Sequence, residues 1–185
     1  MKHELGPGSF LIAGPTLTDP NFQRTVVLLC DHGPEGSLGL VVNRPMRAPL
    51  GKIFPDLASF TEKLGMMNYG GPVESNRIMA LCCNGTGDEA QVFDRVHLVA
   101  DVEAAVQRLA DGIASPEEYR FFLGYAGWGK GQLQSEMNLN AWIARPASQK
   151  LIFDIQPKHI WPQALREIGG TNALFAEMPA DPTQN

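Results

Sequence analysis

Glycine and proline divide this chain into short apolar segments, and this division limits the folds that the chain can adopt. The two residue types make up 33 of the 185 residues, and the longest unbroken apolar run is six residues, from Ile78 to Cys83. A helix that crosses a bilayer needs about 20 apolar residues, so we expect no membrane span. Short apolar runs between Gly and Pro turns are typical of a sheet of many short strands.

The composition is that of an ordinary globular protein. Apolar residues are 44% of the chain and charged residues 19%, which excludes a wholly disordered chain. A chain of this length buries enough surface for a core without a disulfide or metal to hold it together. We therefore expect one domain over residues 1–185, with frayed termini.

Apolar periodicity places strands in hairpin-like pairs, with few helices between them. The hairpin pattern is clearest where a β-branched run, a Gly-Pro turn and a second apolar run follow one another. Regular alternation of strands and helices is absent, so we predict an α+β fold with a mixed, mostly antiparallel sheet and helices packed outside. The expected strands are 10–13, 25–30, 38–42, 78–83, 91–93, 97–100, 119–125, 142–144 and 151–153, and the main expected helices are 53–64, 102–110, 132–138 and 160–168.

Charge and cysteine content exclude several classes of function. The net charge is −5 and no window gathers Lys and Arg, so direct binding to nucleic acid is not expected. No secretory apolar segment is seen near the start, and we expect a soluble, cytoplasmic protein. Cys30, Cys82 and Cys83 are odd in number and irregularly spaced, which does not favour a secreted disulfide framework. We expect one or both of Cys82 and Cys83 to be buried as small apolar residues.

No residue set is spaced as a metal or cofactor site. The four histidines are isolated from one another, so we expect no metal. Gly124 to Gly131 reads G-x-x-x-x-G-K, but Gly131 stands where a phosphate loop has Ser or Thr to bind magnesium. Tyr125 and Trp128 also add bulk where backbone wraps a phosphate. We interpret 127–131 as a tight glycine-rich loop and expect no cofactor, with nucleotide binding as the alternative.

The segment that follows this loop contains the best candidate for a binding site. Gln132 and Glu136 are four residues apart on an expected helix and form a polar stripe beside its apolar face. Trp142 follows closely and can wall a pocket together with Trp128. In the alternative reading both tryptophans are core residues and Glu136 only accepts a hydrogen bond from the backbone.

Five blocks occur in order over about residues 9–170. They are Phe10–Pro15 with Leu17, Asp19–Phe22 and Arg24–Val27; Gly36–Pro45; Gly70–Val73; Gly124–Tyr125 with Trp128, Gly131–Leu133, Glu136 and Trp142; and Trp161 with Ala164 and Gly169. On these blocks the chain resembles the YqgE/AlgH family of bacterial proteins. The resemblance implies one compact α+β domain with its sheet bent into a barrel-like shape. Gln134 and Lys158–His159 depart from the family pattern, which often has acids there.

The resemblance implies no catalytic residues, because none are agreed for the family. We predict a non-enzymatic cytoplasmic protein that binds a protein partner or a small ligand and can serve regulation. One alternative is an enzyme with an acid/base site around Glu136, Asp19 and Asn43. Another, which the family's name suggests, is an indirect transcriptional regulator. The candidate binding residues are Trp128, Gln132, Glu136, Trp142, Asp19 and Asn43.

Overall fold

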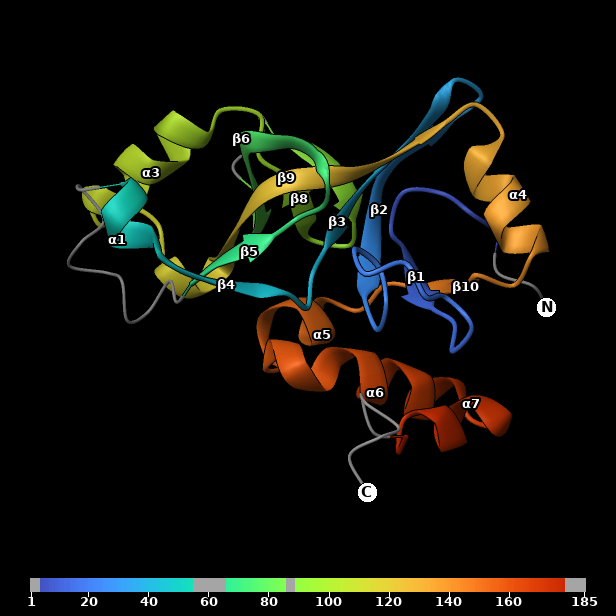
Figure 1. The fold of residues 1–185 in the computed structure, drawn as a ribbon. Coiled ribbons are helices and arrows are strands. Elements are labelled where there is room, and N and C mark those ends of the chain that lie inside the picture. The colour runs from blue at the N-terminus through green and yellow to red at the C-terminus, as the bar shows by residue number, and fades with distance from the viewer. Residues whose placement is uncertain (1–3, 55–65, 86–88, 179–185) are drawn as a thin grey trace.

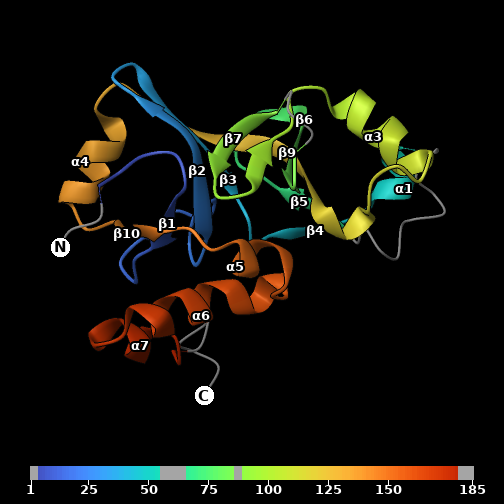
Figure 2. The same ribbon diagram turned by 180° about the vertical axis from the view of Figure 1, so that it is seen from behind.

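A ten-stranded, mostly antiparallel sheet dominates the described part of the chain. The computed structural model describes residues 4–54, 66–85 and 89–178. The sheet curls into a half-barrel with helices outside it, which confirms the predicted fold class (Figures 1 and 2). Its strands lie side by side in the order β10 (Trp142–Pro146), β1 (Ser9–Ala13), β2 (Val26–Gly33), β3 (Gly36–Val41), β9 (Tyr119–Gly129), β6 (Val73–Cys83), β8 (Val96–Leu98) and β7 (Ala90–Phe93).

Two further strands attach to this path. β4 (Pro45–Pro49) pairs antiparallel with β5 (Met66–Tyr69), and β5 runs parallel to β9. The predicted hairpin is present as β2 and β3, which pair from Val27 opposite Val41 to Gly33 opposite Gly36.

The long strand β9 holds the two halves of the sheet together. Its first part pairs with β6, and its last residues, Ala126 to Gly129, pair with β3. Gly70 bridges the strands on either side of it, because its N–H donates to the Leu123 carbonyl and its carbonyl accepts from the Val41 N–H. A Cβ at Gly70 would lie 2.1 Å from the Gly124 carbonyl oxygen, so this approach requires glycine.

Successive side chains along each strand point to opposite faces of the sheet, and apolar residues on both sides build a core on each face. In β2, Val26 and Leu28 face one cluster with Trp161 of α6 (Pro157–Ile168), while Val27 and Leu29 face a second. The second cluster includes Leu133 of α4 (Gln132–Asn138). A third lies between β6, β9 and α3 (Val102–Ala110). Within the described residues, the other helical segments are α1 (Leu50–Ile53), the 3-10 turn Pro116–Glu118, α5 (Gln149–Phe153) and α7 (Thr171–Phe175).

Two sequence predictions of secondary structure are wrong. Residues 151–153 form part of α5, because the Ser148 carbonyl accepts from Leu151 and Ile152 and turns the chain. The predicted loop 127–131 is strand as far as Gly129, since Gly127 and Gly129 pair with β3. Of the helix expected at 53–64, all but the first two residues lie outside the described residues.

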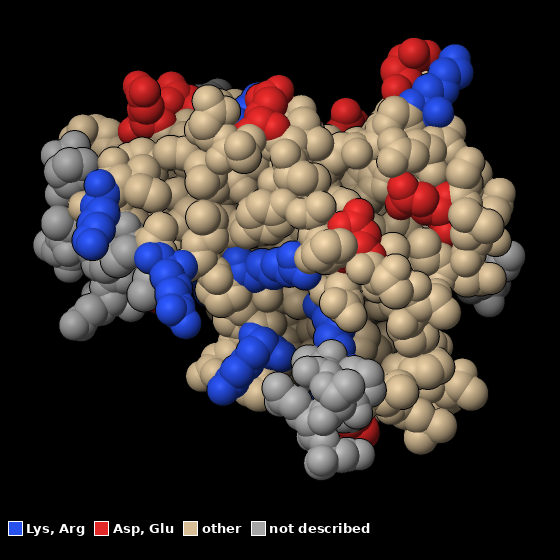
Figure 3. Space-filling view, viewed as in Figure 1, with Lys and Arg blue, Asp and Glu red and all other residues tan. Residues whose placement is uncertain are grey.

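On the face shown in Figure 3, most basic side chains lie apart from most acidic ones. Figure 3 shows Lys and Arg side chains along the lower left of the face seen there, from α1 past β4 toward the start of α6. Acidic side chains lie along the upper edge and on the right-hand part of the same face. In the described part of the chain, no helix is long and apolar enough to cross a bilayer.

Candidate functional site

α4 is positioned by the turn that ends β9. Gly131 has φ +72°, a left-handed value that suits glycine, and the helix begins at the next residue. The Gln132 side chain accepts a hydrogen bond from the Gly129 N–H (3.1 Å) and donates one to Oε1 of Glu136 (3.0 Å). Leu133 is buried against the sheet. The polar stripe predicted from the four-residue spacing is therefore present, and its two members bond to each other.

Glu136 joins the two tryptophans that the sequence analysis singled out. Its Oε2 accepts from Nε1 of Trp128 (2.9 Å) and from Nε1 of Trp142 (2.7 Å). Both indoles are buried, with 5% and 3% of their surface exposed, so each N–H needs an internal acceptor. A carboxylate that accepts from N–H groups forms hydrogen bonds stronger than neutral ones.

Phe22 completes this cluster, although it is not among the site residues predicted from the sequence. Its ring centroid lies 6.2 Å from that of Trp128 and 5.5 Å from that of Trp142. The two indoles are 6.0 Å apart in an edge-to-face arrangement. A lone aromatic residue directly after the Asp19-Pro20 turn is the signal that could have indicated it.

Asp19 and Asn43 lie in a separate set of contacts that shapes the loop carrying Phe22. Oδ1 of Asp19 accepts from the Asn21 N–H (2.8 Å) within the turn. The Asn43 side chain accepts from the Val26 N–H (2.9 Å) and donates to the Arg24 carbonyl (2.9 Å). The structure therefore brings Trp128, Gln132, Glu136 and Trp142 together. Asp19 lies within the turn that supplies Phe22, and Asn43 bonds to the backbone at the end of that segment.

A hollow of about 840 Å³ runs along β10. Trp142 lines this hollow, and Met137 supplies part of the α4 wall. We call it the β10 groove. Its lining residues are Glu4, Leu5, His32, Gln134, Met137, Asn138, Asn140, Trp142, Ile143, Ala144, Arg145, Pro146 and Ile168.

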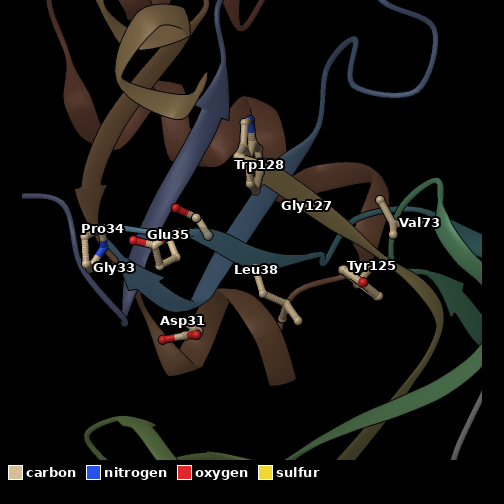
Figure 4. Close-up of a pocket in the computed structure, with 11 residues that line it drawn as sticks. Asp31, Gly33, Pro34, Glu35, Leu38, Val73, Tyr125, Gly127 and Trp128 are labelled. Carbon is tan, nitrogen blue, oxygen red and sulfur yellow. The ribbon is translucent and has the colours of Figure 1, made fainter. Parts of the chain in front are cut away.

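A second, shallower hollow of about 520 Å³ lies beside the β2–β3 hairpin and β9. Figure 4 shows Asp31 and Glu35 at one end of it and Tyr125 and Val73 at the other. Gly33, Gly36 and Gly127 line it with backbone that carries no side chain. Trp128 lines this hollow, whereas Trp142 lines the β10 groove, so the two indoles face different spaces.

The near-match to a phosphate loop is a strand, a tight turn and a short helix. Gly127 and Gly129 are extended in β9, and only Lys130 and Gly131 make the turn. The Lys130 ammonium lies 3.7 Å from the Glu35 carboxylate, with both side chains largely exposed. The backbone therefore does not curl around a space for a phosphate.

A family model described as AlgH-like matches residues 10–173. This chain belongs to the AlgH-like family. A UPF0301 protein of Chlorobium luteolum is 36% identical over 184 residues, covering 98% of this chain and 95% of that protein. A UPF0301 protein of Streptomyces coelicolor is 37% identical over 185 residues, covering 96% of this chain and 94% of that protein. The resemblance inferred from the sequence blocks is confirmed.

Solved structures agree with the AlgH-like fold. The solution structure of the AlgH protein from Pseudomonas aeruginosa matches with a TM-score of 0.74 at 29% identity, over 98% of this chain and 100% of that one. A crystal structure of a protein from Corynebacterium diphtheriae matches with a TM-score of 0.76 at 19% identity, over 96% and 95%. The second likeness concerns the fold alone. The names of these two proteins mention neither a ligand nor a reaction.

Proposed function

We propose that this AlgH-like protein acts in the cytoplasm by binding a segment of a protein partner in the β10 groove. The observation that supports this proposal is an open groove, one wall of which, α4, is held in place by a hydrogen bond from Trp142 to Glu136. Glu136 connects α4 to Trp142 at the start of β10, so the helix that forms one wall is held to the strand that forms the floor. A wall fixed before binding reduces the entropy lost on binding.

The lining of the groove favours a peptide-like occupant. Leu5, Met137, Ile143 and Ile168 supply apolar surface, and the amides of Gln134, Asn138 and Asn140 supply polar groups among them. The volume of about 840 Å³ lies within the roughly 300–1,000 Å³ of ligand sites.

The contacts of Glu136 favour binding over acid/base catalysis. A general base must present an oxygen within hydrogen-bond reach of the substrate proton. Oε2 of Glu136 lies between two indole N–H groups, and Oε1 accepts from Gln132. These donors stabilise the carboxylate as a fixed acceptor, and Asn43 is similarly engaged by backbone at both ends of its amide. Indirect regulation of transcription fits the same proposal, because a partner-binding protein needs no contact with DNA.

A random-peptide phage library selected on the immobilised protein tests the proposal. We expect selected peptides to bind in titration calorimetry, and the Met137→Glu variant to bind them at least 10-fold more weakly. The matched control is Leu174→Glu on α7, where the leucine is 71% exposed and does not line the groove. The control is expected to bind as the unmodified protein does.

Failure to select any peptide, or equal binding by Met137→Glu, would contradict the proposal. The unfolding temperatures of both variants are measured alongside, because Met137 is partly buried against the cluster that contains Trp142. A Met137→Gln variant, which adds no charge, separates loss of folding from loss of contact. It is expected to retain the unfolding temperature and to weaken binding less.

A further inference from the structure

β10 has one unpaired edge. It stands at the end of the strand order in the described sheet, where β1 is its only strand neighbour. The pairing with β1 runs from Ser9 opposite Pro146 to Ala13 opposite Trp142. An edge strand carries a row of backbone N–H and C=O groups that face away from the sheet.

The register identifies which groups face outward. Beyond the two ends of the ladder, the Ala147 N–H donates to the Gly8 carbonyl and the Gly14 N–H donates to the Ala141 carbonyl, each at 2.8 Å. Residues of an antiparallel strand alternate between facing the partner and facing away. Ile143 and Arg145 therefore point their backbone groups to β1.

Trp142 and Ala144 accordingly point their N–H and C=O groups away from β1. Pro146 adds a carbonyl but no N–H. Trp142 and Ala144 are two positions apart, which separates their outward groups by about 7 Å, the two-residue repeat of an extended strand. An extended peptide presents its own donors and acceptors at the same repeat.

The β10 groove follows this edge. All five residues of β10 line it, from Trp142 to Pro146. Leu5 and Met137 belong with Trp142 to the cluster on one face of the sheet, whereas Ile143 and Ile168 belong to the cluster on the other face. A single hollow lined from both faces of a sheet passes around the edge of the sheet.

The edge is recessed between two helices. Figure 1 shows β10 with α4 on one side and α6 on the other, and Figure 2 shows the same order from behind. Arg145 of β10 forms an ion pair with Glu167 of α6, with nitrogen and oxygen 2.7 Å apart, so this arginine is already paired. Apart from Glu4 and His32, the other lining residues are apolar or carry amides.

We propose that the partner segment binds as an extended strand that pairs with the free edge of β10, a step that rests on the function proposed above. The outward groups of Trp142 and Ala144 supply the hydrogen bonds, and alternate peptide side chains point to the α4 wall and the α6 wall. Apolar side chains fit both walls. The occupant is a single peptide segment and not a second copy of this chain, because β10 of a second copy is itself recessed between its own helices.

Amide hydrogen exchange measured by NMR tests this binding mode directly, with a phage-selected peptide as the probe. The amides of Trp142 and Ala144 are expected to exchange at least 10-fold more slowly when the peptide is bound. Those of Ile143 and Arg145, which already face β1, are expected to keep their rates. If the slowing of amide exchange does not alternate along β10, strand pairing is wrong, although the groove can still be the binding site.

Ala144→Pro removes one outward N–H at a position where an edge strand tolerates proline. We expect peptide affinity to fall at least 10-fold, and the matched Ala144→Ser variant, which keeps the N–H, to bind normally. Undiminished binding by a folded Ala144→Pro protein would overturn strand pairing but not groove binding. Protection of Trp142 and Ala144 that appears without peptide and grows with protein concentration would identify a second copy as the occupant and also overturn the inference.

Discussion

Glu136 is the residue on which the arrangement of the site depends. Replacing it with alanine leaves the N–H groups of Trp128 and Trp142 without their acceptor. A buried donor without a partner costs about 1–3 kcal/mol, so we expect Glu136→Ala to lower the free energy of unfolding by about 2 kcal/mol or more. Glu136→Gln keeps one oxygen and is expected to cost less. Urea unfolding followed by tryptophan fluorescence measures both.

The control for this prediction is a carboxylate on the surface. Glu35 pairs with Lys130 at 3.7 Å, and both side chains are mostly exposed. Exposed ion pairs contribute little, so Glu35→Ala should leave the unfolding curve where it is. If Glu136→Ala is as stable as Glu35→Ala, the two indoles find other acceptors and Glu136 is not the link between α4 and β10.

At the scale of single residues, the sequence predicts contacts between side chains of one helix better than contacts between different elements. Gln132 and Glu136 meet because helical spacing alone sets their separation. That Glu136 accepts from two indoles depends on where β9 and β10 place them, and no local pattern contains that information. Phe22 was missed for the same reason, because its partners are more than 100 residues away in the chain.

Among the secondary-structure elements, strands with a β-branched run between turns could be predicted, whereas very short runs could not. β2 and β3 follow directly from their apolar runs and the Gly-Pro turn between them. Residues 151–153 are three apolar residues in a row, too few to show a period of two or of 3.6. Residues 127–129 were read as loop from their glycines, yet pairing with β3 extends them. Tertiary contacts decided both cases.

Glycines also differ in how closely other strands pack against them, and this difference gives a testable prediction. A Cβ at Gly70 would lie 2.1 Å from the Gly124 carbonyl oxygen, whereas a Cβ at Gly33 would meet nothing within 4 Å. We expect Gly70→Ala to lower the free energy of unfolding by about 3 kcal/mol, because β3, β5 and β9 must separate to admit a methyl group. Gly33→Ala is the control.

Gly33→Ala is expected to be neutral or slightly stabilising, since alanine reduces the freedom of the unfolded chain. Thermal unfolding followed by circular dichroism compares the two variants under one condition. Equal stability of Gly70→Ala and Gly33→Ala would mean that β5 does not approach β9 as closely as described.

In the whole molecule, one sheet supports cores on both of its faces, and buried thiols lie in two of them. Cys30 is in the cluster covered by α6, and Cys82 is in the cluster covered by α3. Burial raises the pKa of Cys30 well above its ordinary value of 9.0. Burial, together with nearby Glu89, raises the pKa of Cys82 to about 12. Ionising either thiol in the folded protein would place a charge in a core.

These thiols predict how the stability of the whole molecule changes at alkaline pH. Below the ordinary thiol pKa of 9.0, both the folded and the unfolded protein keep the thiol protons, so these groups cause no dependence on pH. Above it, the unfolded chain releases protons that the folded protein retains, and the free energy of unfolding falls as pH rises. The limit is about 1.4 kcal/mol per pH unit for each thiol. Tyr119, whose pKa burial also raises, adds a loss in the same direction at higher pH.

Urea unfolding from neutral pH to about pH 10 measures this loss, and Cys82→Ala provides the comparison. The variant lacks one of the protons released on unfolding, so its stability should fall less steeply above the thiol pKa although its stability at neutral pH is lower. The unfolding transition should remain single, because β9 connects the clusters that hold the two thiols. An equal alkaline slope for both proteins would show that Cys82 ionises as readily in the folded protein as in the unfolded chain, and that its core is open to water.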